Sequence, residues 1–204
     1  MKESNSKKTE QNKIKDECFK QTEWGNIIGF GRRFVLMAID NLGEERKRFT
    51  ELIGEQATEA ILYSSGKRAG MQASEKMRKI FMNNLDSSVK TTNDDRVDSN
   101  LEVAVKHLNL ADDMGWGYVN YYAVSKDKLE GEIIDCWEAE AYLSAYGKKS
   151  EFPVCHFTRG FGAGLASAYL KKDMEAIELE CLAMGHKKCK MLILTKEAFE
   201  KIKK

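Results

Sequence analysis

The apolar residues of this chain recur with a helical period in its first half and with a strand period in its second half, and this change constrains the fold most. Residues 44–64 repeat apolar side chains at helical spacing and predict an amphipathic helix. Two pairs of β-rich runs follow, 118–124 with 129–137 and 177–183 with 191–194, and a turn sequence separates the runs of each pair. Helices followed by hairpins mixed with helices indicate an α+β protein, with an antiparallel sheet and flanking helices.

Further elements are expected around these hairpins. The apolar run at residues 34–39, followed by turn residues at 40–43, predicts a buried strand. Gly66 and Gly70 are expected to interrupt the helical pattern before a second helix at residues 71–82. The other expected elements are a polar surface loop at 83–100, a helix at 101–114, a short helix at 138–146 and a glycine-rich helix at 155–171.

The 204 residues are enough for one domain with its own core. Residues 1–23 hold almost no apolar side chains and predict a disordered or peripheral arm, so we expect a single domain over residues 24–204. The longest apolar run, at 34–39, is too short to span a bilayer. The first twenty residues also lack the apolar stretch of a signal peptide, so a cytoplasmic protein is expected.

The charge of the chain argues against one class of partner. Lys and Arg number 33 and Asp and Glu number 32, so the net charge is 33 − 32 = +1. A dedicated nucleic-acid-binding domain needs a clear basic excess to neutralise phosphates. We therefore expect no direct nucleic-acid partner.

The five cysteines do not read as a disulfide framework, because their number is odd and no secretory signal precedes them. Three of them lie within 35 residues, with an acidic residue between, in the pattern Cys155-x22-Glu178-x2-Cys181-x7-Cys189. Thiolate and carboxylate donors suit zinc, which accepts a tetrahedral set of sulfur and oxygen ligands. The pattern is a candidate zinc site, although free cysteines are also common as small buried hydrophobes.

The geometry of the second hairpin is compatible with such a site. Cys181 and Cys189 fall on opposite arms, where cross-strand neighbours approach within about 5 Å, and Cys155 at a helix start could close the site. Strict strand alternation places Glu178 on the face opposite Cys181, so a bulge is needed between them. His186 and Glu180 are the alternative fourth ligands, although Glu180 also falls on the wrong face.

Two segments resemble the 4-vinyl reductase domain family. They are Pro153-Val154-Cys155-His156-Phe157-Thr158-Arg159-Gly160 and Glu178-Leu179-Glu180-Cys181-Leu182-Ala183-Met184-Gly185-His186-Lys187-Lys188-Cys189. Trp137-Glu138-Ala139, before the short helix, fits the same family. The similarity is specific over residues 129–194 and weaker back to residue 24.

The resemblance implies an α+β ligand-binding fold shared with haem NO-binding sensors and transport-particle subunits. Phenol-responsive regulators carry such a domain as their sensor, and a homodimer is expected. The family places a structural zinc on residues that correspond here to Cys155, Glu178, Cys181 and Cys189. A site of three cysteines and His186 remains the alternative.

A ligand pocket is expected among the aromatic residues that concentrate in the middle of the chain, because apolar small molecules bind in concave sites with few polar groups. Tyr122 and Phe157 are candidates from this group. The resemblance implies that Trp137 lies near the ligand. It also matches His107 to the histidine that binds the ligand hydroxyl.

Three classes of function compete. The first is a zinc-stabilised domain that binds or senses a hydrophobic or aromatic small molecule, without a DNA-binding or ATPase segment of its own. The second is an enzyme or accessory factor for reduction of a tetrapyrrole vinyl group, and the third is an acyl-binding assembly module, in which Cys18 or Cys136 would carry an acyl thioester. The glycines at 160, 162 and 164 fail as a dinucleotide motif because no strand precedes them. Gly160, Gly164 and Ala168 more simply allow close helix packing. The absence of a recognisable hydride-donor site favours binding over catalysis.

Overall fold

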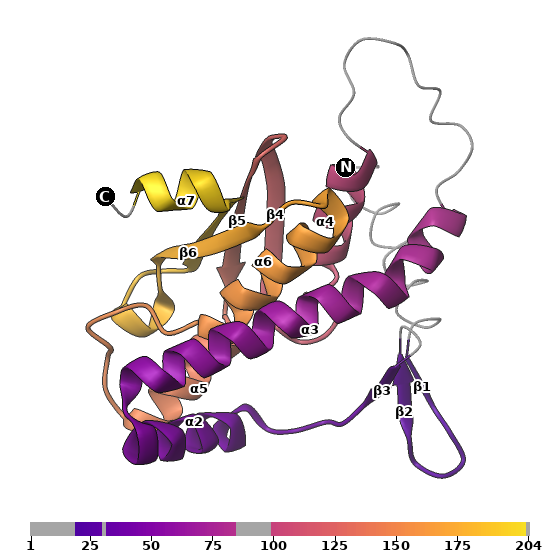
Figure 1. Ribbon diagram of the computed structural model, residues 1–204. Coiled ribbons are helices and arrows are strands. Elements are labelled where there is room, and N and C mark those ends of the chain that lie inside the picture. Colours follow the sequence, from indigo (N-terminus) through magenta and orange to yellow (C-terminus); the bar gives the residue numbers. More distant parts are fainter. Residues whose placement is uncertain (1–18, 30–31, 85–98, 203–204) are drawn as a thin grey trace, which may run out of the picture. The chain divides into compact units, whose positions relative to one another are not determined.

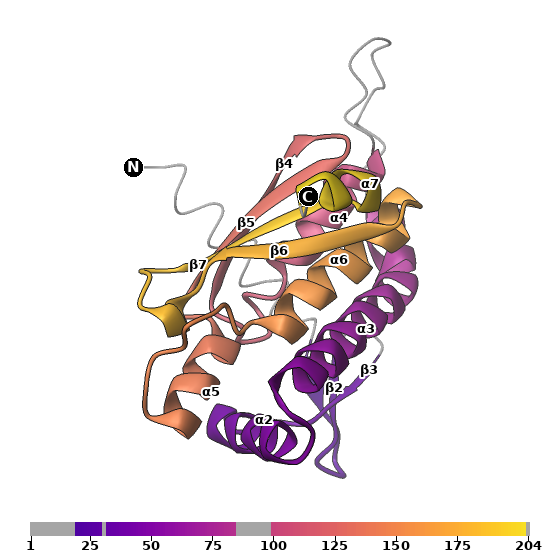
Figure 2. The ribbon, with the colours of Figure 1, turned by 60° about the vertical axis from the view of Figure 1, so that its left-hand side comes forward.

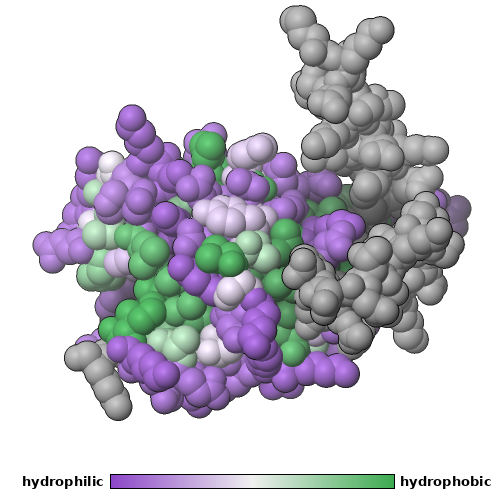
Figure 3. Space-filling view, turned by 90° about the horizontal axis from the view of Figure 1, so that it is seen from above, coloured by the Kyte–Doolittle hydropathy of each residue, from purple (hydrophilic) through white to green (hydrophobic). Residues whose placement is uncertain are grey.

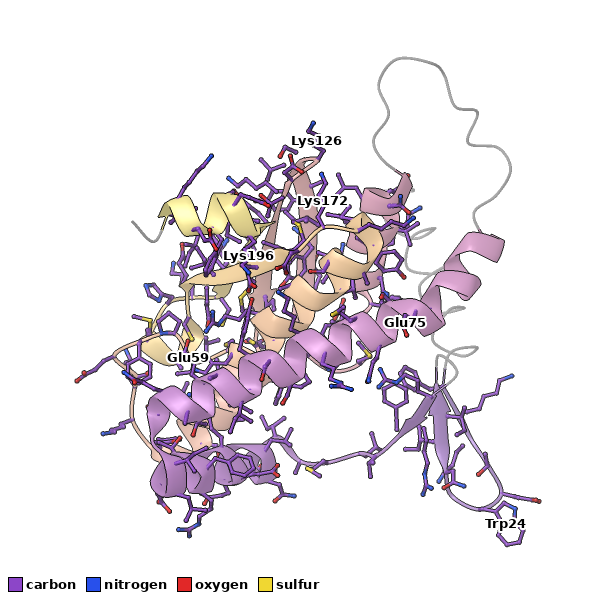
Figure 4. The ribbon with its side chains drawn as sticks, in the orientation of Figure 1. Trp24, Glu59, Glu75, Lys126, Lys172 and Lys196 are labelled. Atoms are coloured by element: carbon purple, nitrogen blue, oxygen red, sulfur yellow. The ribbon has the colours of Figure 1, made fainter. Side chains whose placement is uncertain are left out.

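The structure is a computed structural model that describes residues 19–29, 32–84 and 99–202, and it divides into two compact units, residues 1–37 and 38–204 (Figure 1). The first unit contains an antiparallel sheet of order β1-β2-β3, formed by β1 (Phe19–Gln21), β2 (Ile27–Gly29) and β3 (Arg32–Phe34). Trp24 projects from the turn between β1 and β2 and is 82% exposed (Figure 4). The expected start of the core at residue 24 therefore falls inside this small sheet.

The apolar run at residues 34–39 does not form the expected buried strand. Phe34 ends β3, and Ile39 already begins helix α2 (Ile39–Ile53). Val35 and Leu36, between them, are 81% and 85% exposed and have no regular structure. A short apolar run is compatible with a strand, a helix or a connection, and here it spans the boundary between the two units.

The helical pattern expected at 44–64 belongs to two helices. Gly54 ends α2 with a φ of +82°, in the left-handed region that favours glycine, and α3 (Glu55–Asn84) begins at the next residue. Helix α3 then continues through Gly66 and Gly70, so the predicted interruption is wrong. Much of the expected loop at 83–100 lies outside the described residues.

The second unit has the predicted α+β architecture, with an antiparallel sheet of order β4-β5-β7-β6. Both predicted hairpins are confirmed, and pairing of β5 with β7 joins them. The strands are β4 (Tyr118–Ser125), β5 (Lys128–Ile134), β6 (Met174–Glu180) and β7 (Cys189–Thr195), and the remaining helices are α4 (Ser99–Asn109), α5 (Trp137–Tyr146), α6 (His156–Leu170) and α7 (Lys196–Ile202). A single turn of 3-10 helix, η1 (Leu182–Met184), lies between β6 and β7.

Helix α6 lies between the sheet and α3, and both views show α3 and α6 side by side (Figures 1 and 2). The close approach comes from glycines on both helices: Gly66 and Gly70 on α3, Gly160 and Gly164 on α6. A Cβ atom on Gly164 would overlap the backbone carbonyl oxygen of Lys67, and the other three positions meet backbone oxygens in the same way. The predicted close helix packing is confirmed, and the glycines expected to break α3 are the ones that make it possible.

The core of the second unit lies where α6 covers the sheet. Its largest fully buried side chains include Leu129, Ile133, Leu165, Tyr169, Met174, Met191 and Ile193. At the edge of the helix pair, Glu59 of α3 forms an ion pair with Arg159 of α6 (Figure 4). On the face shown in Figure 3, hydrophilic side chains surround an apolar area. Among the described residues, no helix is both long and apolar enough to cross a membrane.

Candidate metal centre and adjoining cavity

Three elements bring the four predicted metal ligands to one buried point. Cys155 precedes the first turn of α6, Glu178 lies in β6, Cys181 directly follows β6, and Cys189 begins β7. One donor atom from each residue lies within 4.8 Å of the others, and all four residues are buried. The structure therefore brings together the residues that the motif singles out.

A bulge allows Glu178 and Cys181 to face the same point. The pairing of β6 with β7 shifts register between Glu178 and Glu180, where strict alternation would otherwise separate the two side chains. The bulge predicted from the spacing is thus present.

The sulfur distances fit a tetrahedral zinc ion. Cys155 Sγ lies 3.6 Å from Cys189 Sγ and 3.9 Å from Cys181 Sγ. Zinc–sulfur bonds of about 2.3 Å at tetrahedral angles place ligand sulfurs about 3.8 Å apart. The donor set and its dimensions therefore suit zinc.

Glu178 both holds the site together and offers an oxygen to it. Its Oε2 accepts a hydrogen bond from the Cys155 backbone N–H at 2.9 Å. Its Oε1 is buried and has no hydrogen-bond partner among the described residues. A buried carboxylate oxygen without a partner is costly, and a metal ion would satisfy it.

The electrostatics of the metal-free cluster are those of acids crowded away from water. Burial, followed by the negative charge of Cys181, raises the pKa of Glu178 to about 9. The pKa of Cys181 is lowered because the neighbouring Cys155 and Cys189 thiols donate to its sulfur, and burial raises the pKa of Cys155. A divalent cation stabilises all of these groups in their ionised form, so metal binding releases protons.

The alternative fourth ligands lie outside the cluster. His186 is exposed, and its Nδ1 lies 3.1 Å from the backbone nitrogen of Cys181 and 3.0 Å from the carbonyl oxygen of that residue. This contact holds the turn that carries Cys181. Neither His186 nor Glu180 belongs to the group of donor atoms that converge, whereas Glu178 does.

Cys136 is a functional candidate that the sequence reasoning missed. It directly precedes α5, it is fully buried, and its Sγ lies 3.6 Å from Cys155 Sγ. No ligand spacing connects it to the other cysteines, because the contact depends on the return of the chain from β5 past β7. The one available signal was its place directly before the Trp137-Glu138-Ala139 motif.

A buried carboxylate connects α5 to the start of α6. Glu138 Oε1 accepts the Phe157 backbone N–H at 2.9 Å, and Oε2 accepts the Thr158 backbone N–H at 2.8 Å. These donors belong to the first turn of α6, which has no partners within the helix. Burial raises the pKa of Glu138 to about 7, against the lowering effect of the two N–H groups.

A small cavity lies between α4, α6 and the first two strands of the sheet. Its lining is mostly apolar and consists of Leu108, Ala111, Trp116, Val119, Tyr121, Ile133, Thr158, Phe161 and Gly162. Its free space holds about one water molecule. An aromatic ring fits only if some of these side chains move.

Aromatic rings continue the cavity wall toward α5. Trp116, which lines the cavity, has its ring centroid 4.8 Å from Phe161, 5.9 Å from Trp137 and 6.0 Å from Phe157. Trp137 and Phe157, predicted from the sequence, therefore belong to the aromatic cluster behind the lining. Trp116 belonged only to the general aromatic supply, and Phe161 lies in the helix noted for its glycines.

Two buried polar atoms near these rings have no hydrogen-bond partner among the described residues. They are the indole nitrogen Nε1 of Trp137 and the hydroxyl oxygen Oγ1 of Thr158. Thr158 also lines the cavity. Buried polar groups are normally paired, so these two atoms are candidates to contact a ligand.

The other two predicted ligand residues lie elsewhere. His107 is buried in α4 with its Nδ1 3.0 Å from the Tyr169 hydroxyl, and burial lowers its pKa to about 4, so the ring is neutral at pH 7. Tyr122 is 39% exposed, and its hydroxyl donates to Glu130 at 2.9 Å. Its neighbour Tyr121 points to the opposite face of β4 and lines the cavity.

Solved structures share this fold. The phenol-responsive sensory domain of the transcription activator PoxR, solved with phenol, matches with a TM-score of 0.72 at 20% identity, over 92% of this chain and 90% of that chain. Subunit 3 of a trafficking protein particle complex from Naegleria fowleri, covalently bound to palmitic acid, matches with a TM-score of 0.50 at 14% identity, over 78% and 95% of the two chains. No curated protein sequence matches the chain significantly.

The family comparison covers the part of the chain that carries the metal centre. Residues 133–195 match the family model of the vinyl-4-reductase domain, and they contain the segment from Cys136 to Cys189. This match confirms the resemblance to the 4-vinyl reductase family that the cysteine and glutamate motif predicts.

Proposed function

We propose that the second unit is a zinc-stabilised domain that binds or senses a small hydrophobic or aromatic molecule. The observation that carries the proposal is the aromatic-walled cavity, with the unpaired Oγ1 of Thr158 in its lining. The sensory domain with phenol that shares this fold supports the same class of ligand.

The cavity chemistry defines the ligand. Its walls suit a small planar apolar molecule, and Thr158 Oγ1 or Trp137 Nε1 would bind one hydroxyl or carbonyl group on it. Because the free space holds only about one water, binding would displace side chains such as Phe161.

The zinc ion would have a structural role. Cys155, Glu178, Cys181 and Cys189 would fill the four tetrahedral positions, and a closed site leaves no position for substrate. The ion would connect the turn between β6 and β7 to the beginning of α6. Thr158, three residues after Cys155, lies in the helical turn that the ion would fix.

The proposal includes a homodimer in the cytoplasm, with no direct contact to nucleic acid. The exposed apolar side chains of Leu52, Ile53 and Ile61 are surfaces of the kind that subunit contacts cover.

Ligand binding can be tested by titrating the full chain with phenol and toluene while following tryptophan fluorescence. Thr158→Val removes the hydroxyl at nearly constant shape, so the affinity for phenol should fall about tenfold and that for toluene should stay unchanged. Tyr122→Phe is the matched control and should leave both affinities unchanged, because Tyr122 lies outside the cavity lining. Equal effects of Thr158→Val on both ligands, or no binding of either ligand to the wild-type chain, would contradict the proposal.

A further inference from the structure

Cys136 lies as close to the metal centre as the predicted ligands do. Its Sγ is 3.6 Å from Cys155 Sγ, the same distance that separates Cys155 from Cys189. With Cys181 at 3.9 Å, three sulfurs surround Cys155 at the spacing of about 3.8 Å expected for ligands of one tetrahedral zinc ion.

The fold fixes Cys136 in this position. Ile133, near the end of β5, pairs with Cys189 on β7, so the chain passes the cluster just before Cys136. Cys136 then occupies the N-cap of α5, where the helix dipole stabilises a thiolate.

We propose that Cys136 is a fifth donor of the metal centre and can take the fourth coordination position in place of Glu178. The two arrangements are three sulfurs with one carboxylate oxygen, and four sulfurs. This inference rests on the proposed zinc site and extends its ligand set to a second helix. Soft ions favour the four-sulfur arrangement because they prefer thiolates to carboxylates.

The exchange links the metal centre to the ligand cavity. Cys136 directly precedes Trp137, whose ring contacts Trp116 of the cavity lining. A metal bond to Cys136 would fix the beginning of α5, and with it the position of the indole.

The first test uses Glu178→Gln in the full chain and counts zinc ligands by X-ray absorption spectroscopy at the zinc edge. We expect one zinc ion per chain with four sulfur neighbours, and loss of the fourth sulfur in the double variant Glu178→Gln/Cys136→Ala. Three sulfurs with a nitrogen or oxygen in Glu178→Gln, or loss of its zinc while the wild type keeps zinc, would overturn the role of Cys136. A wild-type chain that binds no zinc would overturn the proposed metal centre as well, so the two failures are distinguishable.

The second test needs no change at Glu178 and decides the matter if that variant does not fold. The wild-type chain and Cys136→Ala are loaded with cadmium-113, a soft ion, and compared by NMR. The wild-type resonance should lie in the range of four sulfur ligands and move upfield in Cys136→Ala. A resonance of three sulfurs and one oxygen in the wild type, unchanged in Cys136→Ala, would overturn the proposal.

Discussion

Single residues determine how this domain tolerates buried polar groups. Glu178 and Glu138 are both buried carboxyls with raised pKa values, but their surroundings differ. Glu138 receives two backbone N–H groups, whereas Glu178 receives one and keeps a second oxygen without a partner among the described residues. The first arrangement caps a helix, and the second is suited to a metal.

The buried histidine of α4 makes stability depend on pH. The pKa of His107 falls from its ordinary value of 6.5 to about 4 in the folded chain, so the unfolded chain binds more protons between these values. Its contribution is present above pH 6.5 and is lost as the pH falls toward 4. Urea unfolding of His107→Asn should show a loss between pH 7 and pH 5 that is about 2 kcal/mol smaller than in the wild type. An identical pH dependence in the two proteins would show that His107 is protonated in the fold.

The choice of fourth ligand makes a separate prediction. Cys181→Ser should abolish zinc binding, because it removes one of the three sulfurs at the centre of the cluster. His186→Asn should keep one zinc ion per chain, because His186 contacts only the backbone of Cys181 in the turn. Metal analysis of the purified variants by mass spectrometry distinguishes them, and loss of zinc from His186→Asn would make the histidine a ligand.

How much of the site the sequence could predict depends on how far apart its parts lie. Cys155, Glu178, Cys181 and Cys189 carry a recognisable motif, and alternation in β6 even indicated the bulge. Cys136 and Phe161 could not be placed, because their contacts arise from packing between elements rather than from spacing along the chain. The exposure of Tyr122 was open for a similar reason: alternation along β4 separates Tyr121 from Tyr122 but does not say which of the two faces α6.

At the scale of elements, the pair α3 and α6 organises the second unit. Gly66 and Gly70 read as helix breakers in isolation, because glycine lowers helix propensity. In the fold they lie against the backbone of α6, as Gly160 and Gly164 lie against that of α3, and the gain from close packing outweighs that cost. Local propensity therefore misplaced the helix boundaries in this region, whereas the hairpins, bounded by turn residues, were predicted correctly.

The glycine contact predicts a contrast between two substitutions on the same helix. Gly164→Ala places a methyl group on the Lys67 carbonyl oxygen, and the backbone there cannot move easily, so the free energy of unfolding should fall by about 2–3 kcal/mol. Gly162→Ala meets the end of the flexible Ile193 side chain and should change stability by less than about 1 kcal/mol. Chemical denaturation of both variants provides the comparison. Equal stability of the two would show that α3 and α6 are less closely packed.

At the scale of the whole molecule, the metal centre lies where the sheet and two helices meet. The carboxy-terminal hairpin, α6 and, through Cys136, α5 all contribute side chains to it. The cavity lies beside the same helix, so an ion that orders the first turn of α6 also orders Thr158 in the cavity wall.

Removal of zinc should therefore loosen a defined part of the molecule. With a strong chelator, backbone amides of the turn between β6 and β7 and of the first turn of α6 should lose protection from hydrogen exchange, because metal binding and folding are coupled. Amides in the middle of α3 should keep most of their protection and serve as the internal control. Uniform protection with and without chelator would show that the cluster is stable without metal.

Native mass spectrometry of the purified full chain tests the central claim, a metal centre within a ligand-binding domain, most directly. We predict a folded chain that carries one zinc ion in addition to its 23.2 kDa mass. Cys181→Ser, prepared in the same way, should lack that ion. A folded wild-type chain at its metal-free mass would contradict the claim.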